Sequence, residues 1–428
     1  MGKRLIDSTL AVYGAAWKAA LPLLKLNRRL RDGWDQRTLS GGLPAPAHLW
    51  IQAASGGEAY LAWEVLKALK SPFKETLRVL VTTNTLQGFE TLTRAAAEIN
   101  GEKRGIAVQP WYFPFDAPDI MDSMVRHVSP QAALILETEI WPGFLKACKQ
   151  HGVRVLLANG RMTTKSLGGY MTWPALFRDL GPERIMAVSE TDGRRFGTLF
   201  GRERVWVMPN IKFDRMVEAG PMARKNNPLK NLIPAKSSFV VFGSVRKQEN
   251  IQVRKLAAAL VRYKPETTIG LFPRHMHHVP IWEKAMNAGG LTWTLRSNMT
   301  GPAQPGTVII WDTFGELVPA YGLAKAAFVG GSLVPLGGQN FLEPLTCGVK
   351  PVIGPHWKNF AWVGNEIFDS GLALKGDDTE HVLNLLINIL EDAPRRTEIT
   401  QKAKAYIRDR KGGAKAVCKQ VADFLNKV

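Results

Sequence analysis

Short apolar runs alternate with helix-like patterns along most of this chain. In the first half the runs that predict strands are His48–Ala54, Leu77–Thr83, Ala133–Leu136, Val153–Ala158 and Ile185–Val188. A second series predicts strands at Phe239–Gly243, Thr268–Phe272, Val308–Trp311, Ala326–Val329 and Pro351–Ile353. Strands that alternate with helices are typical of parallel sheets, so the fold class is predicted to be α/β with two sheets.

Changes in composition predict the domain boundaries. Val217–Lys236 is polar, basic and contains Pro and Gly without a strand or strong helix pattern, as expected of a linker. We therefore predict an N-terminal segment (1–40), a Rossmann-like domain (41–216), the linker (217–236) and a second Rossmann-like domain (237–428) that ends in one or two helices over Thr397–Val428. Two doubly wound domains facing each other across a cleft bind ligands at the carboxyl ends of their strands.

The N-terminal segment has its own character. Leu10–Leu26 is mostly apolar, carries Lys18 and Lys25, and is predicted to break at Pro22, so it is too short and interrupted to predict a membrane span. The flanking basic residues are Lys3, Arg4, Arg28, Arg29, Arg31 and Arg37. Two interpretations stay open: docking on an anionic membrane face, or an amphipathic helix packed on the first domain. The segment lacks the small-residue cleavage site of a secretory signal.

The amino-acid composition limits the compartments in which the protein is expected to work and the partners that it is expected to bind. The 428 residues are 45% hydrophobic, enough for two cores. The cysteines, Cys148, Cys347 and Cys418, lie far apart, which argues against a disulfide framework or a thiolate metal site and favours the cytoplasm. The formal net charge of +19 predicts a negatively charged partner: nucleic acid, anionic lipid or a phosphorylated substrate.

Three acidic residues follow strands of the first domain. Glu58 begins a helix after the Ser55-Gly-Gly turn, and it either faces the cleft or caps its own helix. Glu137 and Glu139 lie two residues apart at a strand end and can project to one side. Either they manage a proton or a cation, or one of them bonds the loop backbone.

Basic residues stand in complementary positions. Lys212 follows the last strand of the first domain, and Arg274 with His275 follows a strand of the second, so these cations can neutralise phosphate. His275, His277 and His278 lie adjacent without companion carboxylates, which is poor geometry for a metal, and no metal site is predicted.

Two turns of the second domain predict ligand contacts. Asp312–Glu316 offers a strand-to-helix turn that suits a phosphate. In Ala327–Glu343 a strand enters a glycine-rich turn and then a helix expected to begin near Asn340, with Glu343 one turn inside it. This pattern suits the phosphate and ribose of a nucleotide sugar, although a packing turn without a ligand gives the same pattern.

Taken in order, these motifs resemble the 3-deoxy-manno-octulosonic acid (Kdo) transferase family, whose members are glycosyltransferases of the GT-B fold. The matching motifs are SGGE (Ser55–Glu58), ETEIWP (Glu137–Pro142), IKFD (Ile211–Asp214), PRH (Pro273–His275) and the stretch from Asp312 to Pro344 with DTFGEL and FVGGSLVPLGGQNFLEP. YFPFDAP (Tyr112–Pro118) and ANGRMTTKSLGGY (Ala158–Tyr170) are also similar to family segments.

The resemblance implies transfer of Kdo from CMP-Kdo to a lipid A precursor (lipid IVA), an early step of lipopolysaccharide assembly. It implies that Glu58 is the general base of an inverting reaction and that Glu137 and Lys212 stabilise the transition state. The positions that match the family's CMP-binding segments are Pro273, Arg274, Phe314, Gly315, Glu316, Asn340, Phe341, Leu342 and Glu343. No metal or other cofactor is expected. Because the donor, the phosphorylated acceptor and the cytoplasmic side of the inner membrane are all anionic, they account for the basic charge without nucleic acid.

Two rival functions remain open from the sequence. The first is another GT-B enzyme that uses a UDP-sugar, such as a hexosamine transferase or an epimerase. The second is a non-enzymatic basic module that binds nucleic acid, which lacks support because no aromatic-basic interleaving or nucleic-acid motif is present.

Overall fold

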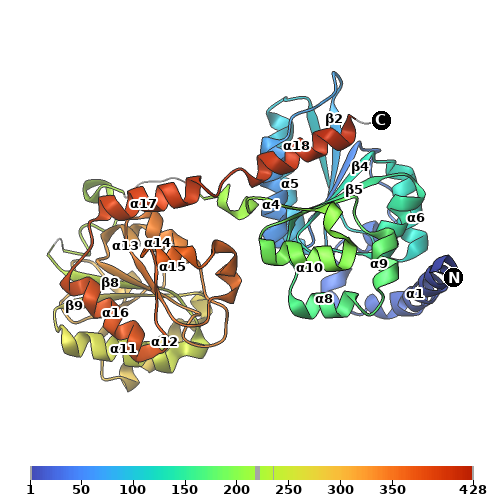
Figure 1. Ribbon diagram of the computed structural model, residues 1–428. Helices are drawn as coiled ribbons and strands as arrows, with labels where there is room; N and C mark the ends of the chain where they lie inside the picture. Colours follow the sequence, from blue (N-terminus) through green and yellow to red (C-terminus); the bar gives the residue numbers. More distant parts are fainter. Residues whose placement is uncertain (1, 217–221, 235, 427–428) are drawn as a thin grey trace. The chain divides into compact units, whose positions relative to one another are not determined.

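The computed structural model describes residues 2–216, 222–234 and 236–426, and the chain divides into two compact units. Unit 1 comprises residues 1–216 and 410–428, and unit 2 comprises residues 217–409 (Figure 1). Each unit is built around a parallel sheet of seven strands, which confirms the α/β class predicted from the sequence.

The sheet of unit 1 has the strand order β3-β2-β1-β4-β5-β6-β7. Its strands are β1 (Leu49–Gln52), β2 (Leu77–Thr83), β3 (Ile106–Tyr112), β4 (Ala132–Leu136), β5 (Arg154–Gly160), β6 (Arg184–Ala187) and β7 (Val205–Val207). All five strands expected for this half are present, and β3 and β7 are additional. The order reverses between β1 and β4, and ligands of such sheets bind where the order reverses, outside the carboxyl ends of the strands.

Helices cover both faces of this sheet. They are α1 (Gly2–Leu24), α2 (Arg28–Arg31), α3 (Trp34–Thr38), α4 (Gly56–Ala68), α5 (Leu86–Gly101), α6 (Pro118–Val128), α7 (Pro142–Gln150), α8 (Thr164–Tyr170), α9 (Pro174–Leu180), α10 (Glu190–Phe200) and α18 (Gly413–Leu425). Alternate strand residues enter two apolar cores: Leu49 and Ile51 face the core with α4, α5 and α18, whereas Trp50 faces the core with α6, α7 and α9.

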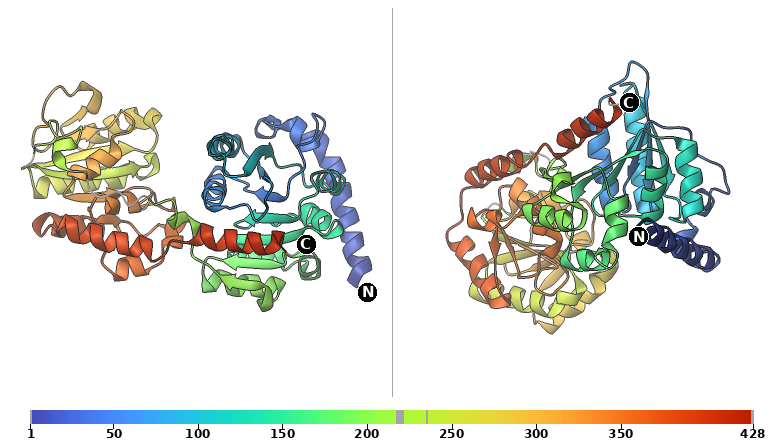
Figure 2. Two further views of the ribbon diagram at one scale, coloured as in Figure 1. Left: turned by 90° about the horizontal axis from the view of Figure 1, so that it is seen from above. Right: turned by 45° about the vertical axis from the view of Figure 1, so that its right-hand side comes forward.

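The N-terminal helix α1 is continuous through Pro22, so the expected break is wrong. Pro22 lies in the last turn, so the hydrogen bond that its missing N–H cannot make is lost only at the end of the helix. The helix packs with one face on unit 1, where it contacts α6 and α9 (Figure 2). On this face Leu10 is buried in the same apolar core as residues of those two helices. The other face leaves apolar residues in solvent, with Val12 65% and Leu23 68% exposed. The packing on the first domain is therefore confirmed, whereas docking on a membrane face stays a prediction.

No helix in the described part of the chain is long and apolar enough to cross a membrane. The expectation that six basic residues flank the apolar segment on a membrane face fails for Arg37. Its side chain is buried, and its guanidinium donates to the carbonyl oxygens of Asp32, Asn84 and Phe113. Arg31 is exposed, whereas the side chains of Lys3, Arg4, Arg28 and Arg29 lie outside the described residues.

The sheet of unit 2 has the order β10-β11-β9-β8-β12-β13-β14, which reverses between β8 and β12. Its strands are β8 (Ser238–Val245), β9 (Thr267–Pro273), β10 (Trp293–Leu295), β11 (Val308–Ile310), β12 (Ala326–Val329), β13 (Pro351–Ile353) and β14 (Leu374–Lys375). Its helices are α11 (Asn250–Tyr263), α12 (Val279–Ala288), α13 (Leu317–Leu323), α14 (Leu342–Thr346), α15 (Glu366–Asp369), α16 (Thr379–Glu391) and α17 (Arg396–Arg408). The five expected strands are present, and β10 and β14 are additional.

The segment expected to be a linker belongs to unit 2 where it is described. Leu229 and Ile233 are buried in the core beside Phe239 and Trp311, because moving apolar side chains out of water stabilises the folded chain. Residues 217–221 and 235 of the expected linker lie outside the described residues.

The C-terminal helix corrects the expected domain boundary. The two expected helices are α17 and α18, but α18 belongs to unit 1, where it contacts α4, β4 and β5 (Figure 1). Asp214 holds its start, since the carboxylate accepts hydrogen bonds from the N–H groups of Gly412 (2.6 Å) and Ala414 (2.7 Å). Val417, Val421 and Phe424 complete the apolar core of unit 1.

We expect Phe424→Ala to destabilise unit 1. Phe424 is fully buried, and a Phe→Ala cavity costs about 3–5 kcal/mol. Amide hydrogen exchange should rise in β4 and β5, whereas the matched core substitution Phe242→Ala should raise exchange in β8 and β9. A rise confined to β8 and β9 for Phe424→Ala would contradict the placement of α18.

Candidate active site

Glu58 lies in the first turn of α4, beside the strand-order reversal of unit 1. The Ser55 hydroxyl donates to Oε1 of Glu58 (2.9 Å) and accepts from the Glu58 N–H (3.3 Å). Oε2 of Glu58 accepts from the N–H of Ala54 (2.8 Å). The N-cap of α4 is therefore Ser55, and Glu58 holds the turn before the helix through its bonds to Ser55 and Ala54. The carboxylate stays half-buried at the carboxyl end of β1.

The surroundings of Glu58 tune its proton affinity. The pKa of Glu58 is raised to about 7, chiefly by burial and then by the nearby Glu139 and Glu137 carboxylates, while the hydrogen bonds from Ser55 and Ala54 oppose the shift. A carboxyl with a pKa near neutrality can take a proton from a hydroxyl at physiological pH.

Glu137 directly follows β4, on the other side of the reversal. Its backbone adopts a left-handed conformation with φ 58°, which is rare for a residue other than Gly. Its Oε1 accepts from Nζ of Lys212 at 2.7 Å. An unfavourable backbone conformation at such a position is a sign of function, because it aims the side chain.

The turn that carries Lys212 is fixed by buried amides. Asn210 accepts a hydrogen bond from the Lys212 N–H (3.0 Å), and Asn159 accepts one from the N–H of Ile211 (2.9 Å). Ile211 and Phe213 are buried. The IKFD motif therefore places one cation, Lys212, between two core residues and ends in Asp214, which caps α18.

Glu139 completes the acidic group. Its carboxylate accepts from the indole N–H of Trp141 (2.7 Å), and burial raises its pKa while that hydrogen bond opposes the shift. Glu137 and Glu139 thus bind side chains, those of Lys212 and Trp141, rather than the loop backbone. The structure places four side chains at the carboxyl ends of the strands, as the sequence predicted: Glu58, Glu137, Glu139 and Lys212.

Unit 2 presents its own set at the carboxyl ends of β8, β9 and β12. Pro273 ends β9 and is buried, and Arg274 is exposed beyond it. Asn340 donates to Glu343 (2.9 Å), and burial raises the pKa of Glu343 while the Asn340 hydrogen bond and Arg274 oppose the shift. Arg274 and Glu343 therefore lie within electrostatic reach of each other.

The glycine-rich turn is longer than the sequence predicted. The helix α14 begins at Leu342 rather than near Asn340, so Glu343 lies in the first turn rather than one turn inside. Gly338 donates back to the carbonyl of Gly331 (2.7 Å), and this fold-back holds the following residues outside the helix. The side chains of Phe341 and Leu342 are buried, so only their backbone is available to a ligand.

The turn after β11 is the most open of the expected ligand segments. Phe314 is 83% exposed, and Gly315 has φ 84°. Glu316 accepts hydrogen bonds from Arg296 (2.9 Å) and Trp311 (2.6 Å), and although burial alone would raise its pKa, these bonds lower it. Glu316 therefore holds the turn as an ionised carboxylate.

Sequence reasoning missed two buried carboxylates that support these loops. Glu249 is fully buried and accepts from the N–H groups of Arg246 (2.8 Å) and Gly331 (2.6 Å), which ties the loop after β8 to the glycine-rich turn across the reversal. Asp116 is buried in unit 1 and caps α7. The signal for Asp116 was its place in the YFPFDAP segment, whereas Glu249 lacked a signal beyond a helix start.

The histidine cluster is exposed and consists of packed rings. The rings of His277 and His278 lie 4.0 Å apart, and slight burial together with the Arg246, Arg274 and Lys247 charges lowers the pKa of His275. Within the described residues no group of three His, Cys, Asp or Glu side chains is arranged to hold a metal ion.

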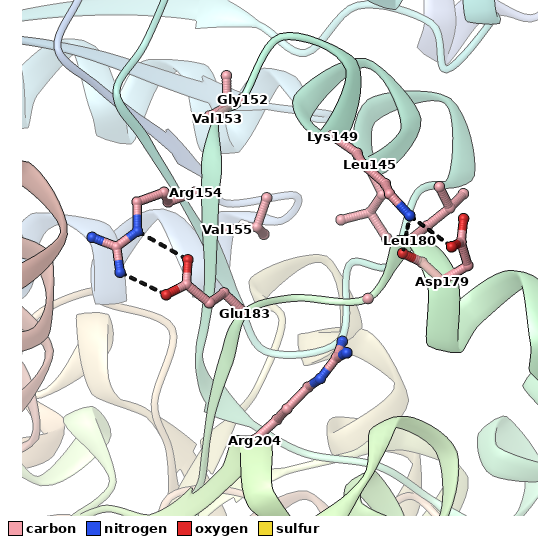
Figure 3. Close-up of a pocket in the computed structure, with 11 residues that line it drawn as sticks. Leu145, Lys149, Gly152, Val153, Arg154, Val155, Asp179, Leu180, Glu183 and Arg204 are labelled. Carbon is pink, nitrogen blue, oxygen red and sulfur yellow. Dashed lines mark hydrogen bonds and ion pairs between the residues drawn. The ribbon is translucent and has the colours of Figure 1, made fainter. Parts of the chain in front are cut away.

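A pocket of about 510 Å³ lies at the opposite ends of the unit 1 strands, beside the amino ends of β5 and β6 (Figure 3). Arg154 pairs there with Glu183 (2.6 Å), and Lys149 pairs with Asp179 (2.6 Å). Because its basic side chains have acidic partners and it lies away from the strand ends that carry Glu58 and Glu137, we do not assign the candidate chemistry to it.

Comparison with solved structures defines the class. The chain is similar to the Anabaena protein HepE solved in complex with UDP (13% identity, TM-score 0.56, 89% of this chain and all of that one). It is also similar to a glycosyltransferase from Rickettsia africae (10% identity, TM-score 0.56, 89% of this chain and all of that one). These similarities and the two parallel sheets define the GT-B fold.

Sequence comparison points to one family. Residues 28–215 match the model of the 3-deoxy-D-manno-octulosonic-acid transferase (kdotransferase) family. The chain is 28% identical to a 3-deoxy-D-manno-octulosonic acid transferase of Bordetella pertussis over 97% of this chain and 98% of that protein. A transferase of the same description from Haemophilus influenzae is also 28% identical, over 82% of each chain. Residues 28–215 therefore form a Kdo transferase family domain, and the chain is similar to Kdo transferases over nearly its whole length.

Because the backbone of Glu137 is left-handed, we predict that Gly is a more stable replacement than Ala at this position. Glu137→Gly should be more stable than Glu137→Ala by about 1 kcal/mol, because both lose the ion pair but only Gly accepts positive φ without strain. Chemical denaturation of the two variants measures the difference. At Glu139, which is not among the described non-Gly residues with positive φ, Gly should instead be the less stable substitution. Equal stabilities at Glu137 would argue against the strained conformation.

Proposed function

We propose that this protein is an inverting glycosyltransferase that moves Kdo from CMP-Kdo to a lipid A precursor (lipid IVA) in lipopolysaccharide biosynthesis. The observation that carries the proposal is Glu58: a hydrogen-bonded, half-buried carboxyl with a pKa of about 7 at the strand-order reversal, with Glu137 paired to Lys212 on the neighbouring strand end. Similarity to the Kdo transferase family supports the sugar.

In the proposed reaction Glu58 is the general base. It takes the proton of an acceptor hydroxyl as the oxygen attacks the anomeric carbon from the face opposite the departing CMP, so the anomeric configuration inverts. The anomeric carbon develops positive charge in such a transition state, and the Glu137 carboxylate offsets it. Lys212 neutralises the sugar carboxylate or the leaving phosphate. The contacts of the two carboxylates suit this division, since Glu58 is bound by neutral hydrogen-bond donors and Glu137 by a cation.

We place the CMP group of the donor on unit 2. The exposed Arg274 supplies positive charge for the phosphate, and the Asn340–Glu343 pair supplies a carboxylate for ribose hydroxyls. The open turn of Phe314 and Gly315 and the backbone of Phe341 and Leu342 border the same strand ends. We propose that these groups bind the nucleotide without a metal ion or other cofactor.

We place the acceptor at the cytoplasmic face of the inner membrane. The net charge of +19 favours the anionic lipid surface and the phosphorylated glycolipid. The exposed stripe of α1 contains Val12 and Leu23, and Leu26 follows it at 75% exposure. Apolar side chains on one face of a helix, with Lys18 and Lys25 beside them, are typical of helices that lie in a membrane interface.

The proposal is tested by mass spectrometry of a tetra-acylated lipid A precursor incubated with the purified protein and fresh CMP-Kdo. We expect one or more additions of Kdo by the parent protein and a loss of about 10²–10⁴ in rate for Glu58→Gln, which keeps the shape but not the base. The rate of the parent should rise with pH through about 7, because Glu58 must be deprotonated.

A parallel incubation with UDP-sugars tests the rival function. Addition of sugar from a UDP donor and none from CMP-Kdo would replace the proposal by a UDP-sugar enzyme. Full activity of Glu58→Gln would still support the proposed reaction, but it would show that Glu58 is not the general base.

The α1 stripe is tested by co-sedimentation with anionic phospholipid vesicles. We expect Val12→Glu with Leu23→Glu to reduce the bound fraction several-fold, because each change places a charge where apolar surface would be buried. Ile251→Glu, the same change at an exposed apolar residue of unit 2, is the matched control and should bind like the parent. Unchanged binding of the double variant would move the docking surface elsewhere.

A further inference from the structure

Asp116 is a buried carboxylate that accepts three hydrogen bonds from two other segments of the chain. Its Oδ2 accepts from the N–H of Gly143 (2.8 Å), and its Oδ1 accepts from the N–H of Phe144 (2.7 Å). The third donor is the hydroxyl of Tyr13 on α1, 2.7 Å from Oδ2. The side chain is 2% exposed, so it serves the interior rather than a ligand.

The two backbone donors belong to the first turn of α7. Trp141, the residue that precedes α7, gives no side-chain cap, so the cap comes from Asp116 in a different loop. The approach is close: a Cβ added at Gly143 would lie 2.3 Å from the carbonyl oxygen of Asp116. Asp116 therefore fixes where α7 begins.

The start of α7 is also the end of the catalytic loop. Glu137, Glu139 and Trp141 lie between β4 and α7, and Trp141 donates to the Glu139 carboxylate. Glu139 is one of the charges that act on Glu58. The position of α7 thus determines where this loop places its carboxylates.

The third donor connects this arrangement to the N-terminal helix. Tyr13 lies on the packed face of α1 together with Trp17, whose ring lies 5.9 Å from that of Phe115, next to Asp116. Leu10 lies in the same apolar core as Ile140 of the loop. The exposed Val12 and Leu23 leave the opposite side of the helix free.

We infer that Asp116 is a positioning residue that couples α1, through Tyr13, to the Glu137–Trp141 loop, so that transfer requires α1 to be seated on unit 1. This inference rests on the proposed function, because it assigns the N-terminal helix a role in the same site. The helix then has two separate faces: an exposed stripe for a lipid surface and a packed face that orders the loop beside Glu58.

The test is Tyr13→Phe, which keeps the ring and removes only the hydroxyl. We expect kcat for Kdo transfer to fall between about ten- and a hundredfold, since small misplacements of reacting groups have effects of this size. The KM for CMP-Kdo should stay unchanged, because the altered contacts lie wholly in unit 1. Amide hydrogen exchange of Gly143 and Phe144 should rise, while that of α4 stays as in the parent.

Two control variants separate coupling from general damage. Tyr263→Phe removes a comparable hydrogen bond, from Tyr263 to Glu391 on the surface of unit 2, and should leave kcat unchanged. Lys149→Ala breaks the exposed ion pair of α7 with Asp179, at the other end of that helix, without touching Asp116 and should also leave kcat unchanged.

Each outcome decides the inference. Unchanged kcat, or unchanged exchange at Gly143 and Phe144, in Tyr13→Phe would overturn it. If the parent protein transfers no Kdo, the proposed function fails by itself, and the exchange of Gly143 and Phe144 in Tyr13→Phe still decides whether α1 holds the start of α7.

Discussion

The ion pair between Glu137 and Lys212 ties the candidate active site to the frame of unit 1. It joins the end of β4, at the centre of the sheet, to the turn that follows β7 at its edge. Glu137 reaches it from a left-handed backbone, and two residues beyond Lys212 the carboxylate of Asp214 caps α18. A single charged contact thus lies where the sheet, the candidate chemistry and the return of the chain from unit 2 come together.

Carboxylates that accept backbone N–H groups recur at the important loops. Glu58 holds the turn before α4, Asp116 caps α7, Asp214 caps α18 and Glu249 holds the glycine-rich turn. Each accepts hydrogen bonds that would otherwise be missing at a helix start or a tight turn, and each bond limits where the neighbouring side chains can lie. Family motifs such as SGGE and IKFD therefore combine a chemical residue with the structural residue that positions it.

The sequence predicted ten of the fourteen strands in the described part of the chain, and the association of Glu58, Glu137 and Lys212 with strand ends. It missed β3 because Pro110 interrupts the apolar pattern, which an edge strand tolerates. The strands β7, β10 and β14 have two or three residues and lie at sheet edges, where they are only partly buried, whereas the equally short β11 and β13 are fully buried and were predicted. The side-chain network of Arg37 and the Tyr13–Asp116 contact join residues far apart in the chain, so local patterns could not reveal them.

The assignment of α18 to unit 1 has a consequence for biosynthesis. Unit 2 is contiguous in sequence and lies within the two segments that build unit 1. During translation residues 217–409 leave the ribosome before α18 does, so unit 2 can fold while the apolar surface that receives Phe424 is still open to water. This surface stays exposed until α18 emerges, so the apolar core of unit 1 can close only after all of unit 2 has been synthesised.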